Sequence, residues 1–355
     1  MPHLDARRPW RAKKKEYNLL LTEIDIKENE IAKQYPDVLN ILLLDNTTQT
    51  NILWATDNYE HLGEKYNFTA QILAELITGI NCNIIMPRVQ KNIFLQQSRS
   101  KHMAEVFTPS WVCNEQNNLI DNAWFGKANE FNTGIKKLNT NSWVINKNKI
   151  TFPENKTWKD YVSDRRLEIA CGEAPYIISR YDTTTGEFIP VEKRIGILDR
   201  KFRVINENVD NNEEWLYAAE TAFKSTYAFE YHGDSLLIAR EAMLVTFIEN
   251  YMQKFEKEPL LESIQNIAYI ISWNVWQMDG LKGVIPKTCG IKTIKTDNLF
   301  GESEIETIQC EGCHKENMFK HNGIYCWIKD WNNKVLETGQ EGQKIRFVDL
   351  SKNKD

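Results

Sequence analysis

The chain has 355 residues, of which 42% are hydrophobic and 11% aromatic, so it is long enough for two domains and apolar enough to bury real cores. Its net charge of −5 excludes a uniformly basic nucleic-acid coat protein, so any DNA contact must come from local patches. No apolar run approaches the roughly 20 residues that span a bilayer, and the basic N-terminus has no apolar signal core, which predicts a cytoplasmic protein with no membrane partner.

Residues 1–100 are predicted to form a helical N-terminal region. Apolar residues fall near helical spacing over residues 15–35, among acids and lysines, which indicates an amphipathic helix. A proline at its start favours a second short helix over residues 36–44. The apolar run at residues 84–86 predicts a brief strand.

A turn before a helix is the first candidate ligand contact. The proline of Phe107-Thr108-Pro109 keeps Thr108 out of the helical region, and Ser110 is expected to cap a helix that follows. In one interpretation Phe107 is a core residue and Thr108-Pro109 is only a cap. In the other, the turn holds the polar end of a ligand. The Asn- and Trp-rich residues 122–160 then predict a small hairpin insertion.

The central stretch, residues 167–177, contains an acid, small or apolar residues and a glycine, with a proline shortly after. It predicts a short buried strand that turns sharply into a helix, with Glu168 facing the crevice at the carboxyl end of the strand. Gly172 can adopt a positive φ and allows a ligand close to the backbone, while the amides of a helical turn would carry partial positive charge. An acid-x-x-x-Gly turn is a weak signal by itself.

A second unit of strand, turn and helix covers residues 226–244. The strand is expected to end at Glu230, and the long helix to be capped by Asp234 or Ser235. A carboxylate in this position would accept hydrogen bonds from both ribose hydroxyls of a nucleoside cofactor. Glu230 follows Glu168 by about sixty residues, where compact nucleotide-binding folds have about twenty, so a helical insertion is expected between them.

The third unit is the apolar segment 267–278, followed by Asp279 and Gly280. Asp279 is expected at the carboxyl edge of the sheet, where it would accept a hydrogen bond from the exocyclic amine of a bound adenine. Because Asp-Gly is also a common turn, a plain turn is the alternative.

Residues 286–355 hold four of the seven cysteines, a pattern that favours reduced thiols and a metal over disulfides. A Cys-x-x-Cys pair with one cysteine before it and one after fits a tetrahedral structural zinc site. In the alternatives, His314 or His321 replaces one thiolate, or the thiols are free. The predicted ligands are Cys289, Cys310, Cys313 and Cys326.

The order of these motifs resembles that of adenine-specific DNA methyltransferases of restriction-modification systems, the kind labelled restriction endonuclease subunit M. The resemblance covers about residues 100–285 and implies a class I S-adenosylmethionine-dependent methyltransferase core, an α/β Rossmann-like fold, over residues 101–285. Residues 286–355 are expected to form a segment held together by zinc and the start of a next strand. By this resemblance the cofactor contacts are Phe107, Thr108 and Pro109 in the motif that closes on the cofactor, Glu168, Cys171 and Gly172 in the glycine loop, the ribose acid Glu230 and the adenine-side acid Asp279. Ala174 stands where the loop usually has its last glycine.

One departure from the family is larger. The chain has no Pro-Pro pair and therefore lacks the Asn/Asp-Pro-Pro-Tyr tetrapeptide that holds the flipped adenine. No catalytic residue is assigned for this reason. The core is expected to be incomplete, a cofactor-binding half that needs a second methyltransferase or restriction subunit for the catalytic motif.

The activity implied by the resemblance is transfer of the methyl group of S-adenosylmethionine to the exocyclic amine of adenine in DNA. One alternative is a non-catalytic, zinc-containing DNA-binding or assembly subunit of a restriction complex, which cofactor binding would distinguish. Another is a methyltransferase acting on RNA or on a small molecule, which product analysis with a partner present would distinguish.

Overall fold

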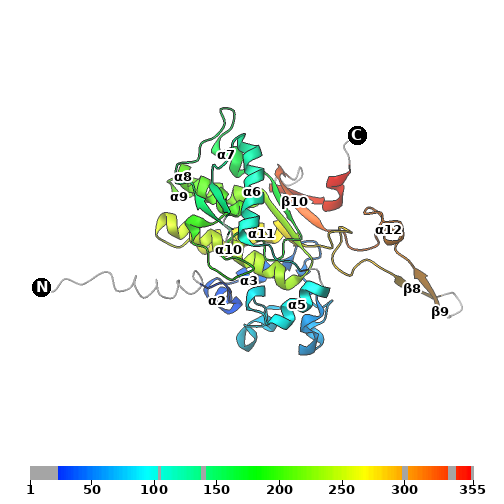
Figure 1. Ribbon diagram of the computed structural model, residues 1–355. Coiled ribbons are helices and arrows are strands. Elements are labelled where there is room, and N and C mark those ends of the chain that lie inside the picture. Colours follow the sequence, from blue (N-terminus) through cyan, green and yellow to red (C-terminus); the bar gives the residue numbers. More distant parts are fainter. Residues whose placement is uncertain (1–22, 103–104, 137–140, 298–302, 335–340, 353–355) are drawn as a thin grey trace.

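The computed structural model describes residues 23–102, 105–136, 141–297, 303–334 and 341–352, and these form a mixed α/β protein (Figure 1). A three-stranded parallel sheet lies at its centre, in the order β5 (Arg166–Ile169), β6 (Thr226–Glu230), β7 (Val275–Gln277). Because the strands are parallel, their carboxyl ends meet at one edge, where ligands bind in open α/β sheets. The helices between them in the chain are α8 (Ile197–Asn208), α9 (Asn212–Lys224), α10 (Gly233–Phe255) and α11 (Leu261–Asn274).

Helix α10 lies inside the protein and is buried from Gly233 to Tyr251. It carries one buried cation, Arg240, whose guanidinium donates to four backbone carbonyl groups. These acceptors are the oxygens of Leu42, Leu44, Ser272 and Val275, near the ends of α3 and α11. Arg240 thereby satisfies carbonyls that those ends leave unpaired.

The N-terminal region shares the core of the sheet region, because one apolar cluster extends from Ile26 to Val275. The predicted helix over residues 15–35 is described only in part, as α2 (Glu28–Gln34), since residues 1–22 lie outside the described residues. The second helix is confirmed as α3 (Val38–Leu43), but residues 84–86 form no strand. The remaining elements here are β1 (Leu44–Asp45), β2 (Thr50–Asn51), η1 (Asp57–Leu62), η2 (Glu64–Tyr66), α4 (Ala74–Ile77), η3 (Gly79–Asn81), η4 (Arg88–Gln90) and α5 (Ile93–His102).

The hairpin insertion is confirmed, with β3 (Asn132–Lys136) antiparallel to β4 (Asn141–Ile145), between α6 (Ser110–Phe125) and α7 (Trp158–Val162).

Two predicted helix caps are wrong. The N-cap residue of α6 is Pro109, and Ser110 instead donates its backbone N–H to Asp182 at 2.7 Å. The N-cap of α10 is His232, while the buried Asp234 carboxylate pairs with Lys91 and Arg99 at 3.0 and 2.8 Å. Arg99 belongs to α5, so its ion pair with Asp234 connects α5 to the start of α10.

The C-terminal segment covers one face of the sheet. A second apolar cluster joins Phe229 and Trp276 of the sheet to Ile328 and Phe347. The hairpin of β8 (Lys292–Asp297) and β9 (Ser303–Ile308) projects from the body in Figure 1. The other elements of this segment are α12 (Glu311–His314), β10 (Trp327–Lys334), β11 (Glu341–Arg346) and η6 (Phe347–Ser351).

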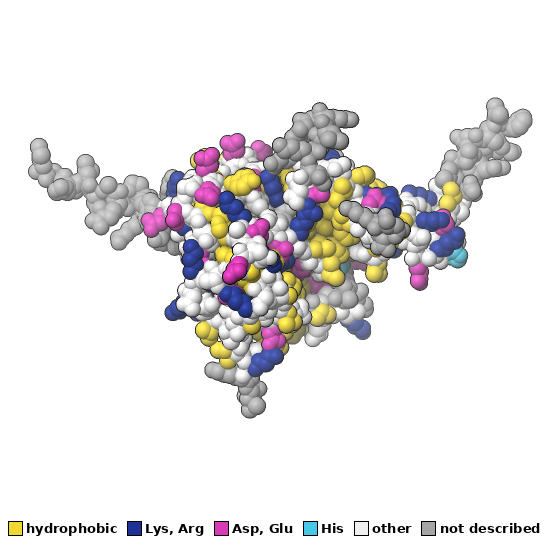
Figure 2. Space-filling view, turned by 90° about the horizontal axis from the view of Figure 1, so that it is seen from above, with side chains coloured by type: hydrophobic (Ala, Val, Ile, Leu, Met, Phe, Trp, Pro, Cys, Tyr) yellow, Lys and Arg dark blue, Asp and Glu magenta, His cyan; other side chains and the backbone are white. Residues whose placement is uncertain are grey.

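Charged side chains of both signs are interspersed on the face that Figure 2 shows, rather than gathered into one basic surface. None of the described helices combines the length and the apolar character needed to cross a bilayer.

Candidate functional site

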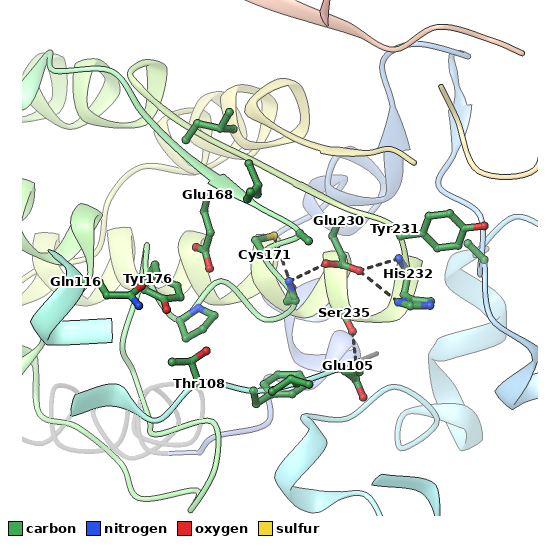
Figure 3. Close-up of a pocket in the computed structure, with 18 of the residues that line it drawn as sticks. Glu105, Thr108, Gln116, Glu168, Cys171, Tyr176, Glu230, Tyr231, His232 and Ser235 are labelled. Carbon is green, nitrogen blue, oxygen red and sulfur yellow. Dashed lines mark hydrogen bonds and ion pairs between the residues drawn. The ribbon is translucent and has the colours of Figure 1, made fainter. Parts of the chain in front are cut away.

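A cavity of about 1030 Å³ opens at the carboxyl ends of β5 and β6 (Figure 3). Its walls come from the N-terminal region, the turn before α6, α6 itself, the loop after β5, and the first residues of α8 and α10. Most of the predicted cofactor contacts line it, namely Phe107, Thr108, Glu168, Cys171, Gly172 and Glu230. The fold thus gathers motifs that lie far apart in the sequence.

Two predicted contacts are not among the described residues that line the cavity. Pro109 serves as the N-cap of α6. Asp279 lies two residues beyond β7, at the predicted edge of the sheet, but its carboxylate accepts the N–H of Leu281 at 3.1 Å and pairs with Lys282 at 3.4 Å.

Glu230, at the end of β6, connects two walls of the cavity. Its Oε2 accepts the backbone N–H of Gly172 at 2.8 Å, and its Oε1 accepts the backbone N–H of His232 at 3.1 Å. The imidazole Nδ1 of His232 lies 3.3 Å from the same Oε1. Burial would raise the pKa of Glu230, but the hydrogen bonds and charge of His232 and the amide of Gly172 hold it below the ordinary value. Glu230 is therefore an ionised acceptor at neutral pH.

The loop after β5 is not the predicted helix. Residues 172–177 form turns, and three positions have left-handed backbone: Ala170, Gly172 and Ala174, at φ 48°, 55° and 57°. Left-handed residues at every second position cannot be part of a right-handed helix. A Cβ at Gly172 would lie 3.8 Å from the Phe107 ring, so the loop packs closely under that ring.

Ala170→Gly is expected to stabilise the protein by about 1 kcal/mol. Ala170 is exposed and left-handed, so glycine removes the backbone strain and loses little packing. Thermal denaturation measures the change, and Ala170→Val, which is branched at Cβ, should lower the melting temperature instead. A melting temperature that falls with glycine would contradict the strained geometry.

Glu168 lies at the other end of the cavity from His232 and Tyr231 (Figure 3). Its carboxyl group is buried, and burial raises its pKa well above the ordinary value, although the backbone amides of Tyr176 and Ile177 oppose the shift. Its Oε2 has no hydrogen-bond partner among the described residues. An unpaired buried oxygen in a cavity wall is suited to a ligand that donates hydrogen bonds.

Ala55, Asp57 and Phe68 of the N-terminal region form a further wall of the cavity, and no sequence motif predicted it. The side-chain amide of Gln277, at the end of β7, holds this wall in place. It accepts the N–H of Leu53 at 2.8 Å and donates to the carbonyls of Leu53 and Tyr231 at 2.8 and 2.9 Å. Leu53 and Gln277 are 224 residues apart in the sequence, and no local sequence pattern predicts a contact between them.

A second cluster has the donor set of a metal site. Ligand atoms of Cys289, Cys310, Cys313 and His321 all lie within 4.8 Å of one another. The Cys289 sulfur is 3.2 Å from that of Cys310, 3.4 Å from that of Cys313 and 3.2 Å from Nδ1 of His321. A backbone N–H, that of Asn322, points to the Cys310 sulfur at 3.4 Å. Three sulfurs and one imidazole nitrogen that converge in this way can hold a metal ion.

The prediction of Cys326 as a ligand is therefore wrong, and the alternative with His321 takes its place. Cys326 is buried in the second apolar cluster, where its thiol donates to the carbonyl of Gln277 at 3.4 Å. His321 reaches the cysteines because Gly312 lies against it: a Cβ at Gly312 would come within 2.6 Å of the His321 backbone nitrogen.

No protein-family model matches this chain, and comparisons with curated proteins and with solved structures found no match either. The cavity and the cysteine–histidine cluster are therefore the observations that bear on function.

Proposed function

We propose that this chain is the S-adenosylmethionine-binding part of an adenine-specific DNA methyltransferase of a restriction-modification system. The observation that supports this proposal most is the convergence on one cavity of the Phe107-Thr108 turn, the glycine loop and Glu230. These are three of the four motifs in which the sequence resembles such enzymes, and the cavity lies where nucleotides bind in parallel sheets.

In the proposed complex, Glu230 accepts hydrogen bonds from the ribose hydroxyls. An ionised carboxylate has about four acceptor positions, and the amides of Gly172 and His232 take two of them. The His232 imidazole lies 3.3 Å from Oε1, so a ribose that donates both hydroxyls displaces this imidazole. The amino acid part of the cofactor lies toward Glu168, Thr108 and Tyr176, where the cavity wall offers polar groups.

The catalytic tetrapeptide of the family is not present in these 355 residues, and no residue is assigned to the methyl-transfer step. A second methyltransferase or restriction subunit supplies it in this proposal. Strand β5 is compatible with such a partner, because it pairs only with β6 among the described strands and its Leu167 and Ile169 are 47% and 69% exposed. Catalysis would then rest on orientation of the unstacked adenine rather than on a covalent intermediate.

The metal in the proposed protein is a structural zinc held by Cys289, Cys310, Cys313 and His321. Zinc prefers four ligands of this type, and when the protein supplies all four, no position is left open for water or a substrate, as in structural sites. The segment is polar, so metal ligation would replace the apolar burial that it lacks.

Isothermal titration calorimetry of the purified chain with S-adenosylmethionine tests the proposal. A dissociation constant of about 1 to 100 μM is expected, which is about 5.5 to 8 kcal/mol of binding free energy. ATP and NAD are the controls, because they share the adenosine but not the amino acid end. A folded chain that does not bind S-adenosylmethionine would favour the non-catalytic subunit of a restriction complex instead.

A further inference from the structure

The end of the cavity opposite Glu168 has a distinct chemistry. Tyr231 projects to this side of Glu230 in Figure 3, and its ring packs edge-on against Phe68 with centroids 6.2 Å apart. Asp57 lines the cavity two residues after Ala55, whose backbone N–H donates to the Phe68 carbonyl at 2.9 Å, and Lys287 lies over the Phe68 ring at 4.9 Å. Two aromatic rings and a carboxylate suit a flat, nitrogen-rich group that donates hydrogen bonds.

In the proposed function, the position of Glu230 determines which part of S-adenosylmethionine lies at the Tyr231 end of the cavity. The ribose of S-adenosylmethionine lies between its amino acid tail and its base. With the ribose at Glu230 and the tail toward Glu168, the base must extend toward Tyr231. The base would stack on an aromatic ring there, as bases do on exposed aromatic side chains.

Resting on that proposed function, we infer that Asp57 and Phe68 of the N-terminal region bind the adenine of the cofactor, with Asp57 accepting a hydrogen bond from its exocyclic amine. This assignment replaces Asp279, the acid that the family resemblance suggests. Asp57 lines the cavity, whereas the Asp279 carboxylate is engaged by Leu281 and Lys282 outside it.

Burial raises the pKa of Tyr231 to about 12, and the charges of Asp279 and Asp57 add to this shift, so both carboxylates lie near the phenol and the test must distinguish them. The neutral ring of Tyr231 can stack on a base. Gln277 acts as a positioning residue. Its side chain binds the backbone of Leu53, just before the wall formed by Ala55, Asp57 and Phe68, and also the carbonyl of Tyr231.

The test compares S-adenosylhomocysteine with S-inosylhomocysteine by calorimetry. The second has a carbonyl oxygen in place of the exocyclic amine and a hydrogen on the neighbouring ring nitrogen, so the group that would donate to Asp57 becomes an oxygen that repels it. The wild-type chain is expected to prefer the adenosyl ligand by about tenfold or more. Asp57→Asn should reduce this preference to less than about threefold, because an amide can donate to the carbonyl as well as accept from the amine.

Matched variants complete the test. Asp279→Asn and Glu60→Gln, the latter an exposed acid of the same η1 helix, should keep the wild-type preference. Phe68→Leu should weaken both ligands equally, since stacking does not depend on the amine. A preference that survives in Asp57→Asn or disappears in Asp279→Asn overturns the inference. If the folded wild-type chain binds neither ligand, the proposed function itself fails.

Discussion

Glu230→Gln is expected to weaken S-adenosylmethionine binding at least a hundredfold, an estimate based on about 1.5–3 kcal/mol for each of two hydrogen bonds to a charged acceptor. The amide has only one acceptor oxygen, and its NH₂ group would face a backbone N–H of Gly172 or His232. Calorimetry at neutral pH measures the loss. Because the pKa of Glu230 lies below the ordinary 4.5, wild-type affinity should decline through this group only as the pH falls below that value.

Two controls separate this effect from unfolding. Glu220→Gln changes a glutamate of α9 that pairs with Lys224, so its affinity should equal that of the wild type. The melting temperature of Glu230→Gln establishes that the variant is folded. A folded Glu230→Gln that binds within threefold of the wild type would place the cofactor elsewhere than against this carboxylate.

Loss of one ligand of the cysteine–histidine cluster is expected to release the metal and unfold the segment around it. In Cys313→Ser or His321→Ala, the zinc content of purified protein should fall from about one ion per chain to less than about a tenth. Structural zinc contributes about 10 kcal/mol or more to the folding of small metal-bound segments, far above what the polar residues here can replace. Elemental analysis after dialysis gives the metal content, and limited proteolysis should show new cleavage within residues 286–326.

The decisive comparison is Cys326→Ser. This thiol lies in the second apolar cluster, so its loss should lower the melting temperature but leave the zinc in place. If Cys326→Ser lost the zinc and His321→Ala kept it, the four-cysteine site would be correct and the ligand set described here wrong.

The sequence predicted those parts of the fold that depend on local pattern. The strands ending near Glu168 and at Glu230 follow from short apolar runs that meet turn residues, and the structure aligns them in parallel as neighbours. The spacing of the cysteines correctly predicted three of the four residues whose ligand atoms converge in a group that could hold a metal ion.

The errors arise where tertiary contacts override local preference. An alanine is a strong helix former, yet Ala170 and Ala174 adopt left-handed backbone in the loop after β5. Cys326 and His321 are both near the Cys-x-x-Cys pair in the sequence. The close approach at Gly312 brings His321 to the cysteines, whereas Cys326 is buried in the second apolar cluster. The cavity wall formed by Ala55, Asp57 and Phe68 depends on the contact between Leu53 and Gln277, which are 224 residues apart, so no local pattern can reveal it.

Because the cavity wall combines residues 55–68 with residues 230–235, a ligand in the cavity contacts both segments at the same time. The ligand therefore acts as a non-covalent crosslink between the first and middle thirds of the chain. Binding to the native state alone adds RT ln(1 + [L]/Kd) to its stability, about 2.7 kcal/mol at a hundredfold excess over Kd. Hydrogen exchange should therefore slow in both parts together, even though they are separate in the sequence.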